Sequence, residues 1–358
     1  MKQRVINFGP GPSMLPLEVL NKAQTELLNF RDTGMSIVEI SHRSKEYLTV
    51  IEEAENDLRR LMNIPDNYRV LFLQGGASTQ FAAIPLNLMK NMKADYIVSG
   101  SFASKAAKEA MKYGEVRIVG NSKDKNYSYI PKNCQFSDDS DYLHITYNNT
   151  IYGTQYNEVP KTDLTVVADV SSCVLGREID VTKFGMLYAG AQKNMGIAGL
   201  TVVIIREDLI SEPLAITPTM LSYKVASENG SMYNTPPCFA IYMAGLVFKY
   251  LLEKGGVEKQ EEINIKKAKL LYDYLDNSKF FTPTANKDDR SIMNVTFVSG
   301  NEKLDKRLVD EALKEGLVSI KGHRSVGGMR VSLYNAVTYE DTVKLVDFLK
   351  RFEETYEG

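Results

Sequence analysis

The stretch that decides the fold runs from residue 165 to residue 205. It holds three short apolar runs: Thr-Val-Val-Ala-Asp at 165–169, Met-Leu-Tyr-Ala at 186–189 and Leu-Thr-Val-Val-Ile-Ile at 200–205. Each run has the length of a buried strand and is too short for a helix. The first two are separated by one crossover, so we expect them to be parallel neighbours. The third follows Lys193 after only a few residues, too few for a crossover helix, so we expect it to run antiparallel.

Four similar runs lie upstream, at residues 70–73, 96–98, 116–119 and 142–147. Helical patterns alternate with these runs and flank them, at residues 17–28, 45–62, 81–89, 102–113 and 236–252. The last of these helices is expected to carry Pro236 and Pro237 in its first turn and to end at Gly255-Gly256. This alternation predicts an α/β fold, with a mostly parallel sheet covered by helices on both faces.

The pattern changes beyond residue 256. Strands are predicted at 293–298 and 328–333, and a helix is predicted at 304–313. A final helix begins at Thr338, with Asp341 at the spacing of a capping box. We therefore expect a large domain over residues 17–256 and a smaller α/β domain over residues 257–358. An N-terminal segment, residues 1–16, is expected to return and pack with the small domain.

Composition excludes several function classes. The 358 residues include 43 Lys and Arg against 45 Asp and Glu, so no global basic field favours a nucleic-acid partner. The most apolar stretch is far too short to span a membrane. The three cysteines fit no metal or redox spacing, so no metal is expected. The start, Met1-Lys2-Gln3-Arg4, has no apolar signal core, and we expect a cytoplasmic protein.

Functional residues are expected in the loops that follow the strands, because open parallel sheets bind ligands at the carboxyl ends of their strands. Residues 75–80, Gly-Gly-Ala-Ser-Thr-Gln, follow one strand and precede a helix. They suit either an anion seat or a plain capped turn. Asp169 ends another strand, where it is either a turn cap or the partner of a cation. Lys193, taken alone, suits a lysine that reaches solvent. Together, a phosphate seat, a buried acid and a desolvated lysine are what pyridoxal phosphate requires.

Five motifs carry a resemblance that covers nearly the whole chain. With these motifs, the sequence resembles the phosphoserine aminotransferases, fold-type I pyridoxal-phosphate enzymes of the class V aminotransferase family. The resemblance implies a seven-stranded, mostly parallel sheet in the large domain. The motifs are Asn-Phe-Gly-Pro-Gly-Pro at 7–12, Ile-Ser-His-Arg at 40–43, Tyr-Ala-Gly-Ala-Gln-Lys-Asn at 188–194, Gly-Ser-Met-Tyr-Asn-Thr-Pro-Pro at 230–237, and Lys-Gly-His-Arg with Gly-Gly-Met-Arg at 321–324 and 327–330.

The resemblance implies roles toward the cofactor. Lys193 matches the Schiff-base lysine that also moves the Cα proton, and Asp169 matches the partner of the ring nitrogen. Ala77 and Ser78 match the phosphate-loop positions, and Gln192 matches a further donor to the phosphate. Thr150 matches a threonine that contacts the cofactor, and Phe102 matches the residue that stacks on its ring. Asn234 and Thr235 match residues that reach the phosphate from the neighbouring subunit of a homodimer.

The implied reaction is L-glutamate + 3-phosphohydroxypyruvate ⇌ 2-oxoglutarate + O-phospho-L-serine, with formation of 4-phosphohydroxythreonine as a related possibility in pyridoxine biosynthesis. One pocket must accept a distal carboxylate or a distal phosphate, and arginine suits both. The resemblance gives the α-carboxylate to Arg330. It gives the distal anion to His323 and Arg324, together with His42 and Arg43 from the partner subunit. Arg324 also suits a solvated surface residue.

Two positions depart from the family pattern. The phosphate loop lacks an arginine that some members carry, so that contact to the distal anion is either missing or supplied elsewhere, by Lys105 or by the His-Arg pairs. The stacking position, commonly tryptophan, is Phe102, which still offers an aromatic face. His144, inside a predicted strand, is interpreted as a packed or hydrogen-bonded sheet histidine, and the cysteines as small hydrophobes. Tyr152 has no assigned role. The alternatives are another class V activity and a non-catalytic α/β binding protein.

Overall fold

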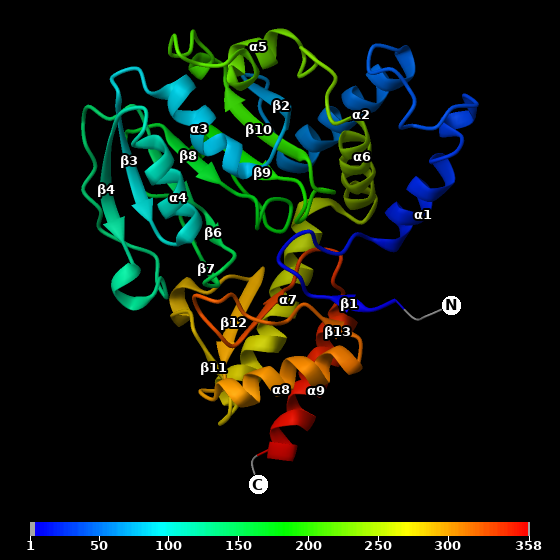
Figure 1. Cartoon of the computed structure of the whole chain (residues 1–358), viewed down its shortest axis with the longest axis vertical. Helices are drawn as coiled ribbons and strands as arrows, with labels where there is room; N and C mark the ends of the chain where they lie inside the picture. Colours follow the sequence, from blue (N-terminus) through cyan, green and yellow to red (C-terminus); the bar gives the residue numbers. More distant parts are fainter. Residues whose placement is uncertain (1–3, 357–358) are drawn as a thin grey trace.

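The computed structural model describes residues 4–356. Its largest sheet has seven strands in the order β2-β10-β9-β8-β5-β3-β4 (Figure 1). They are the seven runs expected from the sequence: β2 (Tyr68–Gln74), β3 (Lys93–Val98), β4 (Glu115–Asn121), β5 (Leu143–Thr146), β8 (Val166–Asp169), β9 (Met186–Gly190) and β10 (Leu200–Arg206). Strand β10 is antiparallel to β2 and to β9, and the other pairs are parallel. Both the mostly parallel sheet and the reversed strand are therefore confirmed.

Both faces of this sheet are buried, except along the edge strand β4. In β10, Val202 and Ile204 belong to one apolar core, whereas Val203 and Ile205 belong to another on the opposite face. The first core includes residues of α2 (Lys45–Met62) and α6 (Cys238–Glu253), which pack together with α1 (Leu17–Glu26). The second includes residues of α3 (Ala77–Leu88) and α4 (Ser101–Ala110). Alternate side chains thus enter different cores, which explains the continuous apolar runs.

The parallel strands direct six loops to one edge. Because β10 is reversed against both of its neighbours, β2 points the same way as β9, and so do β3, β4, β5 and β8. In Figure 1 the arrows of β3 and β4 point down toward the part of the molecule that carries β11 and β12. The loops after these strands therefore meet where the two parts of the chain face each other, the usual place for a ligand.

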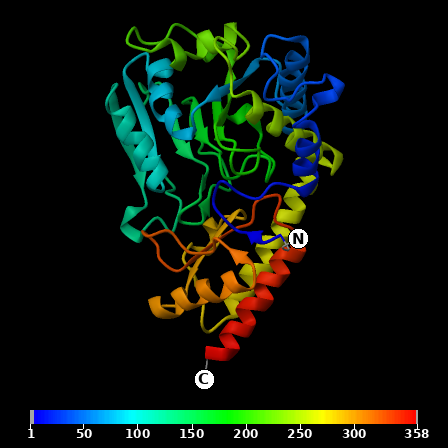
Figure 2. The same cartoon turned by 45° about the vertical axis from the view of Figure 1, so that its right-hand side comes forward.

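The C-terminal part has its own small sheet and core. Strands β11 (Thr282–Pro283), β12 (Asn294–Val298) and β14 (Met329–Ser332) are antiparallel. Three helices accompany them: α7 (Gly256–Asn277), α8 (Glu302–Lys314) and α9 (Tyr339–Tyr356). Figures 1 and 2 show α7 and α9 side by side. The expected capping box is confirmed, because the Thr338 hydroxyl accepts from the Asp341 amide and the Asp341 carboxylate accepts from the Thr338 amide.

The start of the chain joins this part. Strand β1 (Ile6–Asn7) pairs in parallel with β13 (Leu317–Val318), and Phe8 is fully buried in the same core as Val295 and Val331. Residues 1–3 and 357–358, which the expected end segments include, lie outside the described residues. Within the described part, no helix has the length and apolarity that crossing a membrane would require.

Three details differ from the sequence prediction. Helix α6 begins at Cys238, so the two prolines precede the helix instead of lying in its first turn. Helix α3 begins at Ala77, four residues before the predicted start, which places the glycine-rich turn directly at a helix N-terminus. Helix α7 was not among the predicted elements, and neither were the short helix α5 (Tyr223–Glu228) and the hairpin β6 (Asn148–Asn149)–β7 (Thr154–Gln155).

Candidate active site

Lys193 lies in the turn between β9 and β10. Its amine donates a hydrogen bond to the hydroxyl oxygen of Thr150 over 2.7 Å and stands 5.8 Å from the centre of the Phe102 ring. Burial lowers the pKa of this amine to about 8, although the nearby Asp169 carboxylate acts in the opposite direction. A lysine with this pKa is neutral in a substantial fraction of molecules near pH 7–8, as a nucleophile or base must be.

The N-terminal coil holds the backbone of this turn. The amide of Ser13 donates to the carbonyl of Gln192 over 3.0 Å, and the Ser13 hydroxyl donates to the carbonyl of Lys193. Gly11 has a φ of +128°, and a Cβ there would lie 3.2 Å from Cγ of Lys193. The glycine thus allows the coil to approach the lysine closely.

Asp169 ends β8, next to Tyr188 of β9, and it is 7% exposed. Its Oδ1 accepts from the amide of Ser171 over 2.9 Å and from the Ser171 hydroxyl over 2.6 Å. The same hydroxyl accepts from the amide of Gly190 over 3.0 Å. The turn-cap interpretation is therefore correct for Oδ1. The pair of residues is also brought to one edge, because β8 and β9 are neighbours as expected.

Tyr152 connects the Thr150 loop to the helix that carries Phe102. Its hydroxyl shares a 2.7 Å hydrogen bond with the hydroxyl of Ser101, the first residue of α4. Its carbonyl accepts from the Thr296 hydroxyl over 3.0 Å. This gives Tyr152, which had no role in the sequence analysis, a structural one: it links the Thr150 loop to the start of α4 and to β12.

The glycine-rich turn leaves a helix N-terminus open. Gly75 has a φ of +104°, and Gly76 occupies the N-cap position without a side-chain cap. Ala77 and Ser78 form the first turn of α3, whose amides point away from the helix. This end of the helix suits an anion such as a phosphate group.

A cluster of cations faces this edge from the C-terminal part. Arg330 on β14 is buried, and its Nε has no hydrogen-bond partner; burial lowers its pKa. Nδ1 of His323 shares a 2.7 Å hydrogen bond with the Ser325 hydroxyl. The pKa of His323 is lowered by burial first, and then by the positive charges of Arg330, Arg324 and Lys105. The structure thus brings the three predicted residues of this part together, with Lys105 beside them.

Four predicted residues lie apart from Lys193 within one chain. His42 and Arg43 precede α2, and Arg43 is exposed, whereas Nε2 of His42 is buried without a partner. Asn234 and Thr235 are exposed in the segment before α6. The carbonyl of Thr235 accepts from Nε2 of Gln74 over 2.6 Å, beside a cavity of about 360 Å³ that Asn234 also lines. In the described part of the chain, no hydrogen bond or ion pair joins any of the four to Lys193.

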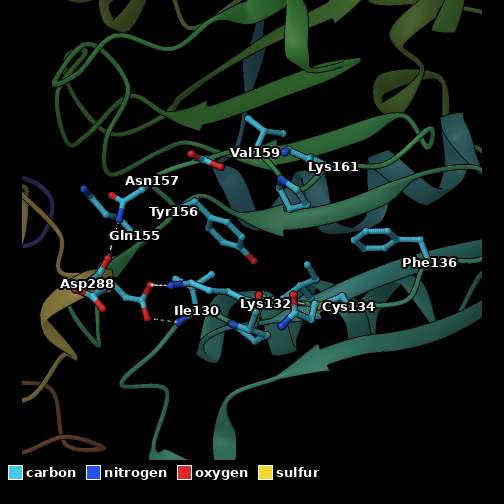
Figure 3. A pocket seen from close by; sticks show the side chains of 16 residues that line it. Ile130, Lys132, Cys134, Phe136, Gln155, Tyr156, Asn157, Val159, Lys161 and Asp288 are labelled. Carbon is cyan, nitrogen blue, oxygen red and sulfur yellow. Dashed lines mark hydrogen bonds and ion pairs between the residues drawn. The ribbon is translucent and has the colours of Figure 1, made fainter.

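A cavity of about 930 Å³ lies elsewhere (Figure 3). The chain segments 130–136 and 155–161 form its walls, and Lys132 makes an ion pair with Asp289 at one side over 3.2 Å. None of the predicted site residues lines it. This cavity is therefore separate from the candidate site around Lys193 at the strand ends.

His144 has the structural role that we expected. It is 1% exposed, its Nε2 pairs with the Tyr188 hydroxyl over 2.9 Å, and its ring stacks on Tyr96 at 4.7 Å. Cys173 is buried, and Cys134 and Cys238 are half-buried. Within residues 4–356, no group of three or more His, Cys, Asp or Glu side chains is arranged to hold a metal ion.

Sequence reasoning missed Ser13, Ser171 and Tyr334. Ser171 stands two residues after Asp169, a spacing typical of an Asx turn, so it was available as a signal. Tyr334 donates to the carbonyl of Pro10 over 3.1 Å. Like Ser13, it forms a hydrogen bond with a loop that is far away in the sequence. No local pattern indicates such contacts.

Comparisons with known proteins agree with this geometry. Residues 5–345 match the family profile described as aminotransferase class-V. The chain is 53% identical to phosphoserine aminotransferase of Lactococcus lactis subsp. lactis (strain IL1403), covering 98% of this chain and all of that one.

Solved structures of phosphoserine aminotransferases are also similar to this chain. Phosphoserine aminotransferase from Bacillus circulans subsp. alkalophilus has a TM-score of 0.96 and 47% identity, covering 98% of this chain and 99% of that one. The PLP-bound phosphoserine aminotransferase from Trichomonas vaginalis has a TM-score of 0.93 and 36% identity, covering 97% of this chain and all of that one. On its sequence, its fold and the placement of its lysine and aspartate, the chain belongs to the class V aminotransferase family.

Proposed function

We propose that the chain is a pyridoxal-phosphate-dependent transaminase that catalyses L-glutamate + 3-phosphohydroxypyruvate ⇌ 2-oxoglutarate + O-phospho-L-serine, a step of serine biosynthesis. The observation that carries the proposal is the position of the Lys193 amine. This amine donates a hydrogen bond to Thr150 and stands over the Phe102 ring. Its pKa is lowered by burial, and Asp169 is close enough to act on it. The similarity to phosphoserine aminotransferases over nearly the full length supports the same reaction.

The residues present fit the cofactor. The open N-terminus of α3, with Ala77 and Ser78, suits its phosphate, and the amide of Gln192, the residue before Lys193, is assigned as a further donor to it. Phe102 suits stacking on the pyridine ring, and Asp169, fixed by Ser171, suits the ring nitrogen. Thr150 and Lys193 stand on the remaining side. When bound, pyridoxal phosphate supplies an electron sink for the electrons of the broken Cα–H bond.

Lys193 is the group that moves the proton. Its amine is held by Thr150 and desolvated, so it can take the proton from Cα of the amino donor in one half of the reaction and deliver a proton to Cα of the keto acid in the other half. The Asp169 carboxylate is held in place at the end of β8, because Ser171 donates two hydrogen bonds to its Oδ1. No histidine is needed as the central base.

Arg330 suits the α-carboxylate of both amino acids. It is buried near Lys193, it has a free Nε, and no ion pair among the described residues includes it. His323 and Arg324 bind the distal group of the substrate, which is a carboxylate in glutamate and a phosphate in phosphoserine. Formation of 4-phosphohydroxythreonine stays a prediction.

The active site is completed in a homodimer. His42, Arg43, Asn234 and Thr235 of one subunit reach the site of the other. In support, the segment around His42 exposes several apolar side chains that a second subunit would cover, namely Leu27, Leu28, Met35, Val38 and Leu48. The chain works as a large domain (17–256) and a small one (257–358) that residues 1–16 join, and the separate small core supports this division. The cytoplasmic location stays a prediction.

Absorbance spectra of the purified protein test the function. We expect a visible band from covalently bound pyridoxal phosphate, and we expect phosphoserine and glutamate, but not alanine, to bleach it rapidly. Lys193→Ala is expected to lose the band. A Lys193→Ala protein that keeps it, or bleaching by alanine as fast as by phosphoserine, contradicts the proposal.

A further inference from the structure

Lys105 is an exposed lysine on the first turns of α4, three residues after Phe102. Residues three apart lie on one face of a helix. The Lys105 ammonium accordingly stands 5.4 Å from the centre of the Phe102 ring, and the Lys193 amine stands 5.8 Å from the same centre. One aromatic ring therefore has the reactive lysine and a second lysine within 6 Å of its centre.

The loop 323–328 reaches this face from the C-terminal part. Val326 packs against the same apolar core as Phe102, and Lys105 is close enough to His323 to depress its pKa, as Arg330 and Arg324 do. In the described part of the chain, no carboxylate forms an ion pair with Lys105, His323, Arg324 or Arg330. These four side chains repel one another when they are charged, and no carboxylate of the protein neutralises them. Together they therefore form a site for a multiply charged anion.

We propose that Lys105 is a ligand of the distal anion of the substrate and favours a phosphate over a carboxylate. The inference rests on the proposed function. The α-carboxylate at Arg330 and the Cα atom at Lys193 leave the distal group on the side of Phe102 that faces His323 and Lys105. A phosphate monoester carries a charge of about −1.5 to −2 at neutral pH, whereas a carboxylate carries −1. An added cation therefore stabilises bound phosphoserine more than bound glutamate.

Lys105→Met tests the inference, because methionine keeps the length of the side chain and removes its charge. Lys108→Met is the matched control: Lys108 is exposed one turn further along the same helix. We expect Lys105→Met to lower kcat/KM for phosphoserine about tenfold and for glutamate about threefold or less. Lys108→Met is expected to change neither. Equal losses for the two substrates, or no loss beyond that of Lys108→Met, overturn the proposal.

A second measurement does not depend on activity. The chain has three histidines, so the His323 ring resonances can be assigned by substitution and titrated by NMR. Inorganic phosphate is expected to raise the pKa of His323 in the wild type, and this rise is expected to be smaller in Lys105→Met. Without phosphate, Lys105→Met alone is expected to raise the pKa of His323, because a neighbouring positive charge is removed.

The two measurements separate the two proposals. If the wild type reacts with neither phosphoserine nor glutamate, the proposed function fails, and the titration alone then decides whether Lys105 faces an anion site. If the wild type reacts with both but phosphate shifts His323 equally in the wild type and in Lys105→Met, only the role of Lys105 is overturned.

Discussion

The amine of Lys193 donates a 2.7 Å hydrogen bond to the hydroxyl of Thr150, a residue 43 positions earlier in the chain. Thr150 follows β5 and Lys193 follows β9, and both strands end at the same edge of the sheet. The bond therefore holds the reactive nitrogen at the point where these loops meet.

The lowered pKa of Lys193 predicts how fast the apoprotein takes up pyridoxal phosphate. Only the neutral amine attacks an aldehyde, so the rate should rise with pH and level off above about pH 8, the pKa of Lys193. An ordinary lysine would keep rising toward about pH 10.4. Stopped-flow absorbance of the apoprotein mixed with the cofactor measures this profile. A rate that still climbs between pH 9 and 10 would show that Lys193 is not desolvated as described.

Ser171 predicts a loss of stability. Its hydroxyl donates to Asp169 and accepts from the amide of Gly190, so Ser171→Ala leaves a buried N–H without a partner. The free energy of unfolding should fall by about 1–3 kcal/mol. Ser137→Ala removes a similar serine–aspartate bond, to Asp139, at the surface, and should change stability by less than about 0.5 kcal/mol. Urea unfolding of both variants measures the difference, and equal effects would contradict the prediction.

The strands of the large sheet were predictable because burial on both faces makes them continuous apolar runs. The same rule failed for α7. Its buried positions include Gln260, Asn264 and Lys267, which interrupt the apolar spacing on which the prediction of helices depends. Their polar groups have tertiary partners, such as the carbonyl of Gly176 for Asn264, and a single sequence does not show such partners.

The core of the site was predictable for a similar reason. Asp169 and Lys193 each follow a buried strand, and one crossover makes those strands neighbours. Ser13, which holds the carbonyl of Lys193, is 180 residues away in the chain and lies in a coil without periodicity. Only the folded structure shows how β1 and the Gly11 turn bring it to the site.

Lys267 predicts a large loss of stability from a residue outside the site. It is 0% exposed, and its amine donates to the carbonyls of Leu333, Tyr334 and Val337 at 2.8–3.1 Å. Lys267→Met removes three buried hydrogen bonds, although the Tyr334 carbonyl keeps the amide of Val337 as a donor, and should cost about 3 kcal/mol or more. Lys269→Met, on the exposed side of the same helix with only a surface ion pair to Asp273, should cost less than about 1 kcal/mol. Thermal and urea unfolding compare the two; a Lys267→Met protein as stable as Lys269→Met would refute this role.

The burial of His144 leads us to expect that the free energy of unfolding depends on pH below 6.5. Burial lowers its pKa from 6.5 to about 3 in the folded protein, so below pH 6.5 the unfolded chain binds a proton that the folded chain does not. The free energy of unfolding therefore falls as the pH drops from 6.5 toward 3, by about 2–3 kcal/mol at pH 4.5 from this residue alone. Other groups titrate in the same range, so the test is a difference. His144→Phe, which loses the bond to Tyr188, should be less stable at pH 7 but lose about 2–3 kcal/mol less than the wild type between pH 7 and 4.5. Urea unfolding at several pH values gives both curves. If the two curves of unfolding free energy against pH run parallel, His144 takes up its proton equally in the folded and unfolded states. Its burial then does not cause the loss of stability at low pH.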